Sequence, residues 1–131
     1  WNGRAWDDRK ICDSDHNYDM GSLFIKGNTW RVIAPTDPGP QPHGSGGELV
    51  MWESRDSGLT WKRKKQLTAD SERNHNYVRR VVNGKSPFVY LWADGNPNVF
   101  SPSYLYIGDE RGNVWPLPYD MEEPEMVLEK K

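Results

Sequence analysis

The sequence predicts an all-β fold of two tandem four-stranded antiparallel units, and three observations support this expectation. Seven Trp and six Tyr supply buried surface to a chain with few aliphatic residues, since each large ring can bury about 150–250 Å². Twelve Gly and ten Pro interrupt the chain too often for long helices. The other apolar residues form short runs separated by turn-forming residues, as strands do.

The first unit is predicted from four short runs that form two hairpins. Met20–Lys26 and Thr29–Ala34 flank the turn residues Gly27-Asn28. Glu48–Glu53 and Thr60–Leu67 flank a polar turn. Each run is rich in β-branched or aromatic residues and is bounded by Gly, Asn, Asp or Pro, which is typical of strands.

The second unit follows the same plan. A turn of Asn, Gly and Lys separates its first two strands, and a Gly-bounded turn separates the last two. The four predicted strands are Asn76–Val82, Pro87–Trp92, Tyr104–Ile107 and Asn113–Leu117.

The two units are related by an internal repeat. Asp15-His16-Asn17-Tyr18 recurs as Asn74-His75-Asn76-Tyr77, 59 residues later. Each copy precedes a hairpin, a Pro/Gly-rich loop (35–47 or 94–102) and a second hairpin. Tandem four-stranded units predict neighbouring blades of a β-propeller; two unrelated meanders are the alternative.

A propeller needs more than two blades. We expect about six or seven in total, with the others supplied by a longer chain or by copies of this one. The predicted blades are 15–70 and 71–118. Residues 1–14 then form a linker or the end of a preceding unit, and 119–131 form a linker to the next one.

Length and charge restrict the classes of partner. The 131 residues fit one ordinary domain. A formal net charge of −2 gives no reason to expect a nucleic acid or an anionic membrane as partner. No apolar run approaches the roughly 18 residues that a membrane helix needs.

Cys12 is the only cysteine, which excludes an internal disulfide and a multi-cysteine zinc site. The chain begins at Trp1, with no apolar signal segment, and its end is acidic and then basic. We interpret both ends as cuts in a longer polypeptide; a small oligomerising protein is the alternative.

One turn carries a specific motif. Ser54, Asp56, Gly58 and Trp61 fit the Asp-box pattern Ser/Thr-x-Asp-x-Gly-x-x-Trp. The Ser and Asp side chains can accept hydrogen bonds from the turn, the Gly supplies a positive φ and the Trp packs over the hairpin. Residues 108–115 read as a degenerate copy that keeps an Asp, a Gly and a Trp but lacks the Ser/Thr.

With these motifs the chain resembles the sialidase-like Asp-box (BNR-repeat) β-propellers, closest to the branch of polysaccharide lyases and glycosidases. The resemblance extends from His16 to Pro118. It implies a carbohydrate-active, secreted or periplasmic protein without an essential cofactor. It also implies that the Asp box, including Asp56, is structural and lies away from the active face.

The repeat predicts where the chemistry lies. His16, Tyr18, His75 and Tyr77 stand at the starts of innermost strands. The loops between second and third strands return to the same end of each blade. We therefore expect these four side chains to converge as candidate catalytic residues; capping and packing between blades is the alternative.

Arg79 completes the predicted catalytic set. By the two-residue period of a strand it shares one face with His75 and Tyr77. An Arg fork suits the carboxylate of a uronic acid. Together with His and Tyr as base and acid, it favours β-elimination from an acidic polysaccharide; an interblade ion pair is the alternative role.

Two other functions remain open. Hydrolysis needs two carboxylates about 5–9.5 Å apart, and the sequence pairs none of Asp15, Asp19, Asp37 and Asp94. There is also no Arg-Ile-Pro motif of the kind that true sialidases carry. The second alternative is a carbohydrate-binding propeller without catalysis. The predicted substrate-binding residues are His43, Trp92, Asp94 and Asn96.

No metal is assigned from the sequence. Asp13, Asp15 and Asp19 form an acidic cluster without the Gly-bearing loop of an EF-hand. Cys12, His16 and His43 could join a structural zinc site only with ligands from other blades. Ca²⁺ and Zn²⁺ are therefore minor alternatives to a site without metal.

Overall fold

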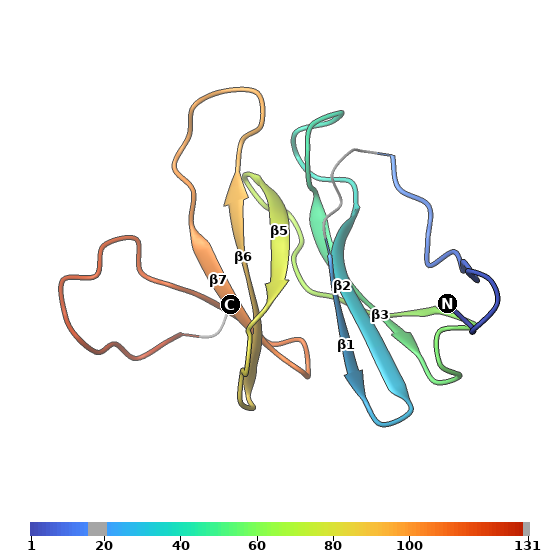
Figure 1. Cartoon of the computed structure of the whole chain (residues 1–131). Helices are drawn as coiled ribbons and strands as arrows, with labels where there is room; N and C mark the ends of the chain where they lie inside the picture. The colour runs from blue at the N-terminus through green and yellow to red at the C-terminus, as the bar shows by residue number, and fades with distance from the viewer. Residues whose placement is uncertain (16–20, 130–131) are drawn as a thin grey trace.

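The computed structural model describes residues 1–15 and 21–129, and its regular elements in those ranges are all β-strands. They form two four-stranded antiparallel sheets, each with its strands in sequence order (Figure 1). This confirms the predicted all-β class and the two tandem units. The first sheet contains β1 (Ser22–Lys26), β2 (Thr29–Asp37), β3 (Glu48–Ser54) and β4 (Lys62–Gln66). The second contains β5 (Asn74–Arg80), β6 (Phe88–Gly95), β7 (Leu105–Asp109) and β8 (Val114–Pro116).

Two strands continue three residues past the ends that the sequence pattern indicates. β2 continues past Ala34 to Asp37, through a register shift between these residues that accommodates Pro35. Because Pro lacks an N–H, it is tolerated at such an irregularity. β6 continues to Gly95, where it pairs with Asn74 at the start of β5.

The two sheets pack face to face around an aromatic-rich core. Ser22 Oγ of β1 donates to the carbonyl of Val78 in β5 and accepts from the N–H of Arg80, at 2.9 and 3.0 Å. Gly47 and His75 exchange two backbone hydrogen bonds across the same junction. The buried cluster between the sheets comprises Ile33, Leu49, Met51, Val78, Val89, Tyr90, Trp92, Tyr106 and Val114.

The outward face of each sheet carries an apolar row across its strands. In the first sheet, Leu23 pairs with Val32, and Val32 with Trp52. In the second sheet, Leu91 pairs with Ile107, which in turn pairs with Trp115. Leu23 is 45% exposed and Leu91 38%. The stack thus buries one face of each sheet and leaves the other partly exposed.

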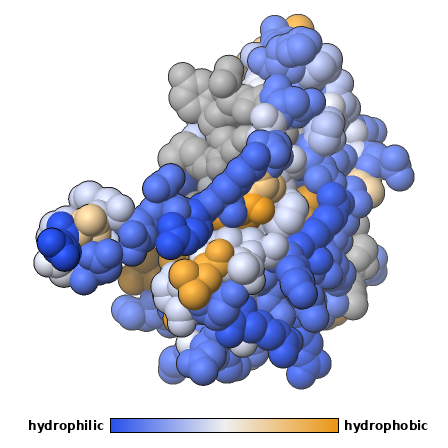
Figure 2. All heavy atoms as spheres, turned by 90° about the vertical axis from the view of Figure 1, so that its right-hand side faces the viewer, coloured by the Kyte–Doolittle hydropathy of each residue, from blue (hydrophilic) through white to orange (hydrophobic). Residues whose placement is uncertain are grey.

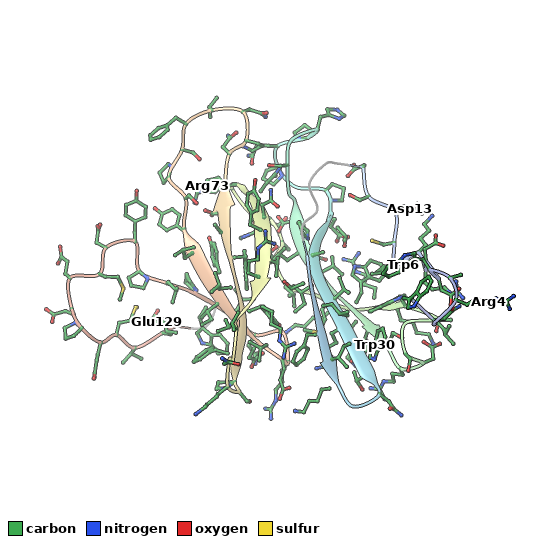
Figure 3. All side chains as sticks on the ribbon, in the orientation of Figure 1. Arg4, Trp6, Asp13, Trp30, Arg73 and Glu129 are labelled. Carbon is green, nitrogen blue, oxygen red and sulfur yellow. The ribbon has the colours of Figure 1, made fainter. Side chains whose placement is uncertain are left out.

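The outward side of the first sheet is also the side of the N-terminal segment. Trp6 and Asp13 lie on the side of this sheet that faces away from the second (Figure 3). Figure 2 looks onto this side and shows apolar atoms near the centre of the face, bordered by hydrophilic ones.

The Asp-box turn has the hydrogen bonds that its motif predicts. Ser54 Oγ accepts the N–H of Gly58 at 2.9 Å, and Asp56 Oδ1 accepts the N–H of Thr60 at 2.9 Å. Gly58 has φ +86°, and Trp61 Nε1 donates to its carbonyl. The hydroxyl and N–H of Thr60 and the hydroxyl of Ser54 hold the pKa of Asp56 down at about 2.

The degenerate turn is capped by a different residue from the one that the motif aligns. Glu110 stands at the Asp position of the pattern, and Asp109 precedes it by one residue. Asp109 Oδ1 accepts the N–H groups of Arg111 and Asn113, at 2.9 and 2.8 Å. Asp109 therefore satisfies this turn alone, which explains why no Ser or Thr is needed.

Candidate functional site

One end of the sheet stack gathers polar groups from both sheets. β5 begins at this end, and the β2–β3 and β6–β7 loops extend from it, while the Asp-box turn lies at the other end (Figure 1). A pocket of about 200 Å³ opens here. Its polar lining includes Ser45, Asn76, Tyr77, Asp94, Asn96 and Ser103.

Tyr77 lies at this pocket in a strained backbone conformation. Its φ is +55°, in the left-handed region that costs a residue with a Cβ about 1–2 kcal/mol. The strand pairing jumps here from Asn76–Ala93 to Arg79–Leu91, so β5 bulges at Tyr77. The ring is 53% exposed. Strain of this kind clusters at functional sites.

The bulge also changes which side chains share a face of β5. Asn76 and Arg79 pair with Ala93 and Leu91, which are two residues apart and lie on the outward face. The Cζ atom of Arg79 is 6.0 Å from the centroid of the Tyr77 ring. His75 pairs with Asp94 on the inward face. The expectation that His75 and Arg79 share one face is therefore wrong, because the extra residue of the bulge breaks the period of two.

Asn76 is the polar residue of this pocket with an unmet hydrogen-bonding group. The residue is 7% exposed, and its Oδ1 accepts the N–H of Tyr77 at 2.8 Å. Its Nδ2 is buried without a hydrogen-bond partner among the described residues. Buried donors without a partner are rare and costly, so this amide is the candidate donor of the pocket.

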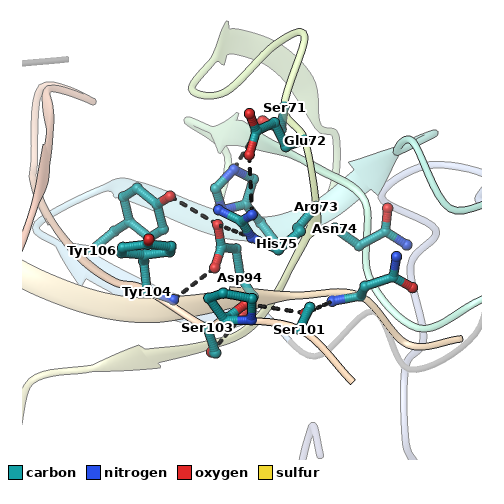
Figure 4. Close-up of polar contacts among 12 residues, drawn as sticks. Ser71, Glu72, Arg73, Asn74, His75, Asp94, Ser101, Ser103, Tyr104 and Tyr106 are labelled. Atoms are coloured by element: carbon teal, nitrogen blue, oxygen red, sulfur yellow. Dashed lines mark hydrogen bonds and ion pairs between the residues drawn. The ribbon is translucent and has the colours of Figure 1, made fainter. Parts of the chain in front are cut away.

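His75 lies inside the sheet stack, with none of its surface exposed. Its Nδ1 accepts the indole N–H of Trp92 at 3.0 Å. Its Nε2 is 3.0 Å from Ser71 Oγ, and both of these residues are labelled in Figure 4. Ser71 also bonds the buried carboxylate of Glu48, at 3.0 Å from Oγ. Because indole is only a donor, Nδ1 must be unprotonated. His75 thus links the two sheets and is not among the residues that line the pocket.

Asp94 organises the loop at the other side of the pocket. Its Oδ1 accepts the N–H of Tyr104 at 2.7 Å, and its Oδ2 accepts Tyr106 Oη at 3.0 Å and Arg73 Nε at 3.2 Å (Figure 4). Burial and the bond to Asp94 raise the pKa of Tyr106, so this phenol stays protonated. Burial lowers the pKa of Arg73, but the charge of Asp94 more than offsets this.

The structure places the other predicted site residues in different surroundings. Tyr77, Asp94 and Asn96 line the pocket together, and His43 lies exposed in the β2–β3 loop with φ +60°. Trp92 is 1% exposed and stacks on Tyr106, with 5.5 Å between ring centroids, so it presents no ring face to a sugar. The remaining predicted residues, His16 and Tyr18, lie outside the described residues.

Sequence reasoning missed Asn76, Ser45 and Ser103. Asn76 belongs to the repeated tetrad, so the sequence does contain a signal for it. Within that tetrad, catalytic roles were assigned only to the His and Tyr, because these side chains act as acids and bases. Ser45 and Ser103 lie in loops without regular periodicity, where a sequence pattern cannot place a side chain.

The described residues include no group of three or more His, Cys, Asp or Glu side chains that could hold a metal ion. Asp13 forms an ion pair with Lys10 instead. Asp19 and His16, which the two sequence-based metal hypotheses use, lie outside the described ranges.

Comparison of the chain with models of protein families, with curated proteins and with solved structures finds no match. Within residues 1–15 and 21–129 there is also no helix with the length and apolar character to span a membrane.

Proposed function

We propose that this chain forms two adjacent blades of a sialidase-like Asp-box β-propeller, whose other blades come from a longer chain or from copies of itself. The observation that carries this proposal is the stacking of two sequential four-stranded sheets, with an apolar row on both outward faces. A blade buries its faces only against neighbours, and such rows offer that contact on both sides.

The pocket at the β5 end is the proposed carbohydrate site. Tyr77, Asn96 and Ser103 offer hydroxyl and amide groups at its surface, which suit the hydroxyl groups of a sugar. Arg79 lies beside Tyr77 and suits a carboxylate, because a guanidinium pairs with it through two N–H donors. The favoured ligand is therefore a polysaccharide that contains uronic acid.

The chemistry that this pair supports best is β-elimination. Arg79 neutralises the uronate carboxylate, and the Oη atom of Tyr77 removes the proton α to it. The electron pair forms the new carbon–carbon double bond and expels the glycosidic oxygen. The phenol of Tyr77 then returns the proton to that oxygen, so that no oxidant or reductant is required.

The pocket supports hydrolysis less well. Asp94 is the acidic residue among the described residues that line it, and both of its carboxylate oxygens are already bonded. Hydrolysis by the usual route needs a second carboxylate. Burial of His75 instead favours a second candidate function, carbohydrate binding without catalysis, because it removes an acid–base group from the pocket.

The test is incubation of the chain with polygalacturonate, followed by ultraviolet absorbance and a reducing-end assay. Elimination produces unsaturated uronate and reducing ends together, and Tyr77→Phe abolishes both. Tyr119→Phe is the matched control, since this Tyr is 63% exposed and is not among the residues that line the pocket. Reducing ends without absorbance would overturn elimination in favour of hydrolysis. Retention of the polymer without any product would assign the binding function.

A further inference from the structure

A second feature, at the Asp-box end of the stack, concentrates positive charge in a chain whose formal net charge is −2. Two pockets of about 450 and 470 Å³ have Lys64 in common among their lining residues. We call them together the cationic cleft. The cations of the first are Lys26, Arg31, Lys64, Lys65 and Arg111. Those of the second are Arg55, Lys62, Arg63 and Lys64. Against these stand the three carboxylates of Glu53, Asp56 and Glu110.

Several of these cations hold the structure together. Arg31 bonds the carboxylate of Glu53 and the carbonyl of Glu110, both at 2.9 Å. Lys65 Nζ donates to the carbonyl of Gly112 at 2.6 Å. These bonds connect the first sheet to the β7–β8 turn, and they fix the two walls of the first pocket.

Three other cations have no such structural role. The side chains of Lys62, Lys64 and Arg111 make no hydrogen bond or ion pair with any residue in the described ranges. Lys64 is the extra residue of a β-bulge in β4, since Met51 pairs with Lys65 and Trp52 with Arg63. A bulge redirects a side chain, and Lys64 lines both pockets.

Protection of an exposed sheet edge does not explain this arrangement fully. Lysines on an edge strand such as β4 discourage aggregation, and this accounts for Lys62 and Lys64. Arg111, however, lies in the turn of the other sheet and lines the same pocket as Lys64. Two sheets thus contribute uncompensated charge to one cleft.

We propose that the cationic cleft binds the carboxylate or sulfate groups of an anionic polysaccharide, at the opposite end of the stack from the pocket of Tyr77. The choice of a polysaccharide rests on the proposed function, but the site itself does not. No aromatic side chain lines either pocket among the described residues, so nucleobases have nothing to stack on. The cleft also contains three carboxylates, which repel an anionic ligand. A polysaccharide with widely spaced charges is repelled less than duplex DNA, which carries one negative charge per ~1.7 Å of its axis.

The test compares binding of the full chain to polygalacturonate, dextran sulfate and neutral dextran by titration calorimetry. We expect the two anionic polymers to bind, and binding to weaken as salt rises, because exposed charges are screened. The triple variant K62Q/K64Q/R111Q should lose about tenfold or more in affinity, since each exposed charge contact is worth roughly a two- to fivefold change. The matched control R4Q/R9Q/K85Q removes the same charge elsewhere and should change affinity less than about twofold.

Four outcomes would overturn the proposal. Equal losses in both triple variants would show a general charge effect, and neutral dextran binding as well as the anionic polymers would exclude charge recognition. If duplex DNA displaces the polysaccharide when the DNA added carries less total charge than the polysaccharide, the cleft would be a nucleic-acid site. Tyr77→Phe separates this proposal from the proposed function. If that variant abolishes product formation while K62Q/K64Q/R111Q binds normally, the cleft proposal fails alone.

Discussion

The indole N–H of Trp92 donates a 3.0 Å hydrogen bond to Nδ1 of His75 in the interior of the sheet stack. This bond joins β6 to β5, and Nε2 of the same imidazole reaches Ser71 and, through it, Glu48 of the first sheet. The imidazole thus connects the two sheets by hydrogen bonds that a hydrocarbon side chain cannot make.

Replacing His75 tests this role. His75→Ala leaves a cavity and removes the hydrogen-bond partner of the buried Trp92 indole. We expect a loss of about 2–4 kcal/mol in the free energy of unfolding, measured by urea denaturation. His43→Ala, at an exposed loop position, should change it by less than about 0.5 kcal/mol. Unchanged stability together with lost activity would instead assign His75 a catalytic role.

The Asp-box carboxylate predicts a pH dependence of stability. Asp56 has a pKa of about 2 in the folded protein, whereas the pKa of an Asp in the unfolded chain is about 3.9. Because the folded value is lower, its stabilisation is complete above about pH 4. It is lost as the pH falls toward about 2. Urea midpoints measured over this range should fall less steeply for Asp56→Asn than for the parent. Parallel curves would contradict the prediction.

Tyr77 should show opposite effects on stability and function. Tyr77→Gly relieves the positive φ and is expected to raise the free energy of unfolding by about 1 kcal/mol. Tyr77→Ala keeps the strain and should give no such gain. Both variants lose the phenol and should lose product formation from polygalacturonate. A glycine variant less stable than the alanine variant would show that the backbone is not strained.

The outward sheet faces should make the isolated chain associate. We expect sedimentation at micromolar concentrations to report a species larger than the monomer, since apolar rows on both faces offer contact to another sheet. Leu91→Lys should shift the population to monomer. Val82→Lys is the control, because this residue is 86% exposed and outside the strands. A parent chain that stays monomeric at all concentrations tested would contradict this prediction.

How far sequence reasoning reached depends on the range of the interactions involved. The eight strands and their pairing order were predictable because short apolar runs and turn residues act locally. The positive φ of Gly58 and the bonds of Ser54 and Asp56 follow from a motif of eight residues. Even there, a shift of one residue concealed that Asp109, not Glu110, caps the second turn.

The sequence by itself determined the local structure: all-β pairing, the repeat and the capped turns, because each depends on residues close together in the chain. Only the tertiary structure decided which side chains are accessible. The bulge at Tyr77 reverses the alternation of β5, so His75 points into the core while Arg79 stays at the surface. Packing of the second sheet against the first buries Trp92 and places Arg111 and Lys64 around the same pocket. No local sequence pattern relates these residues.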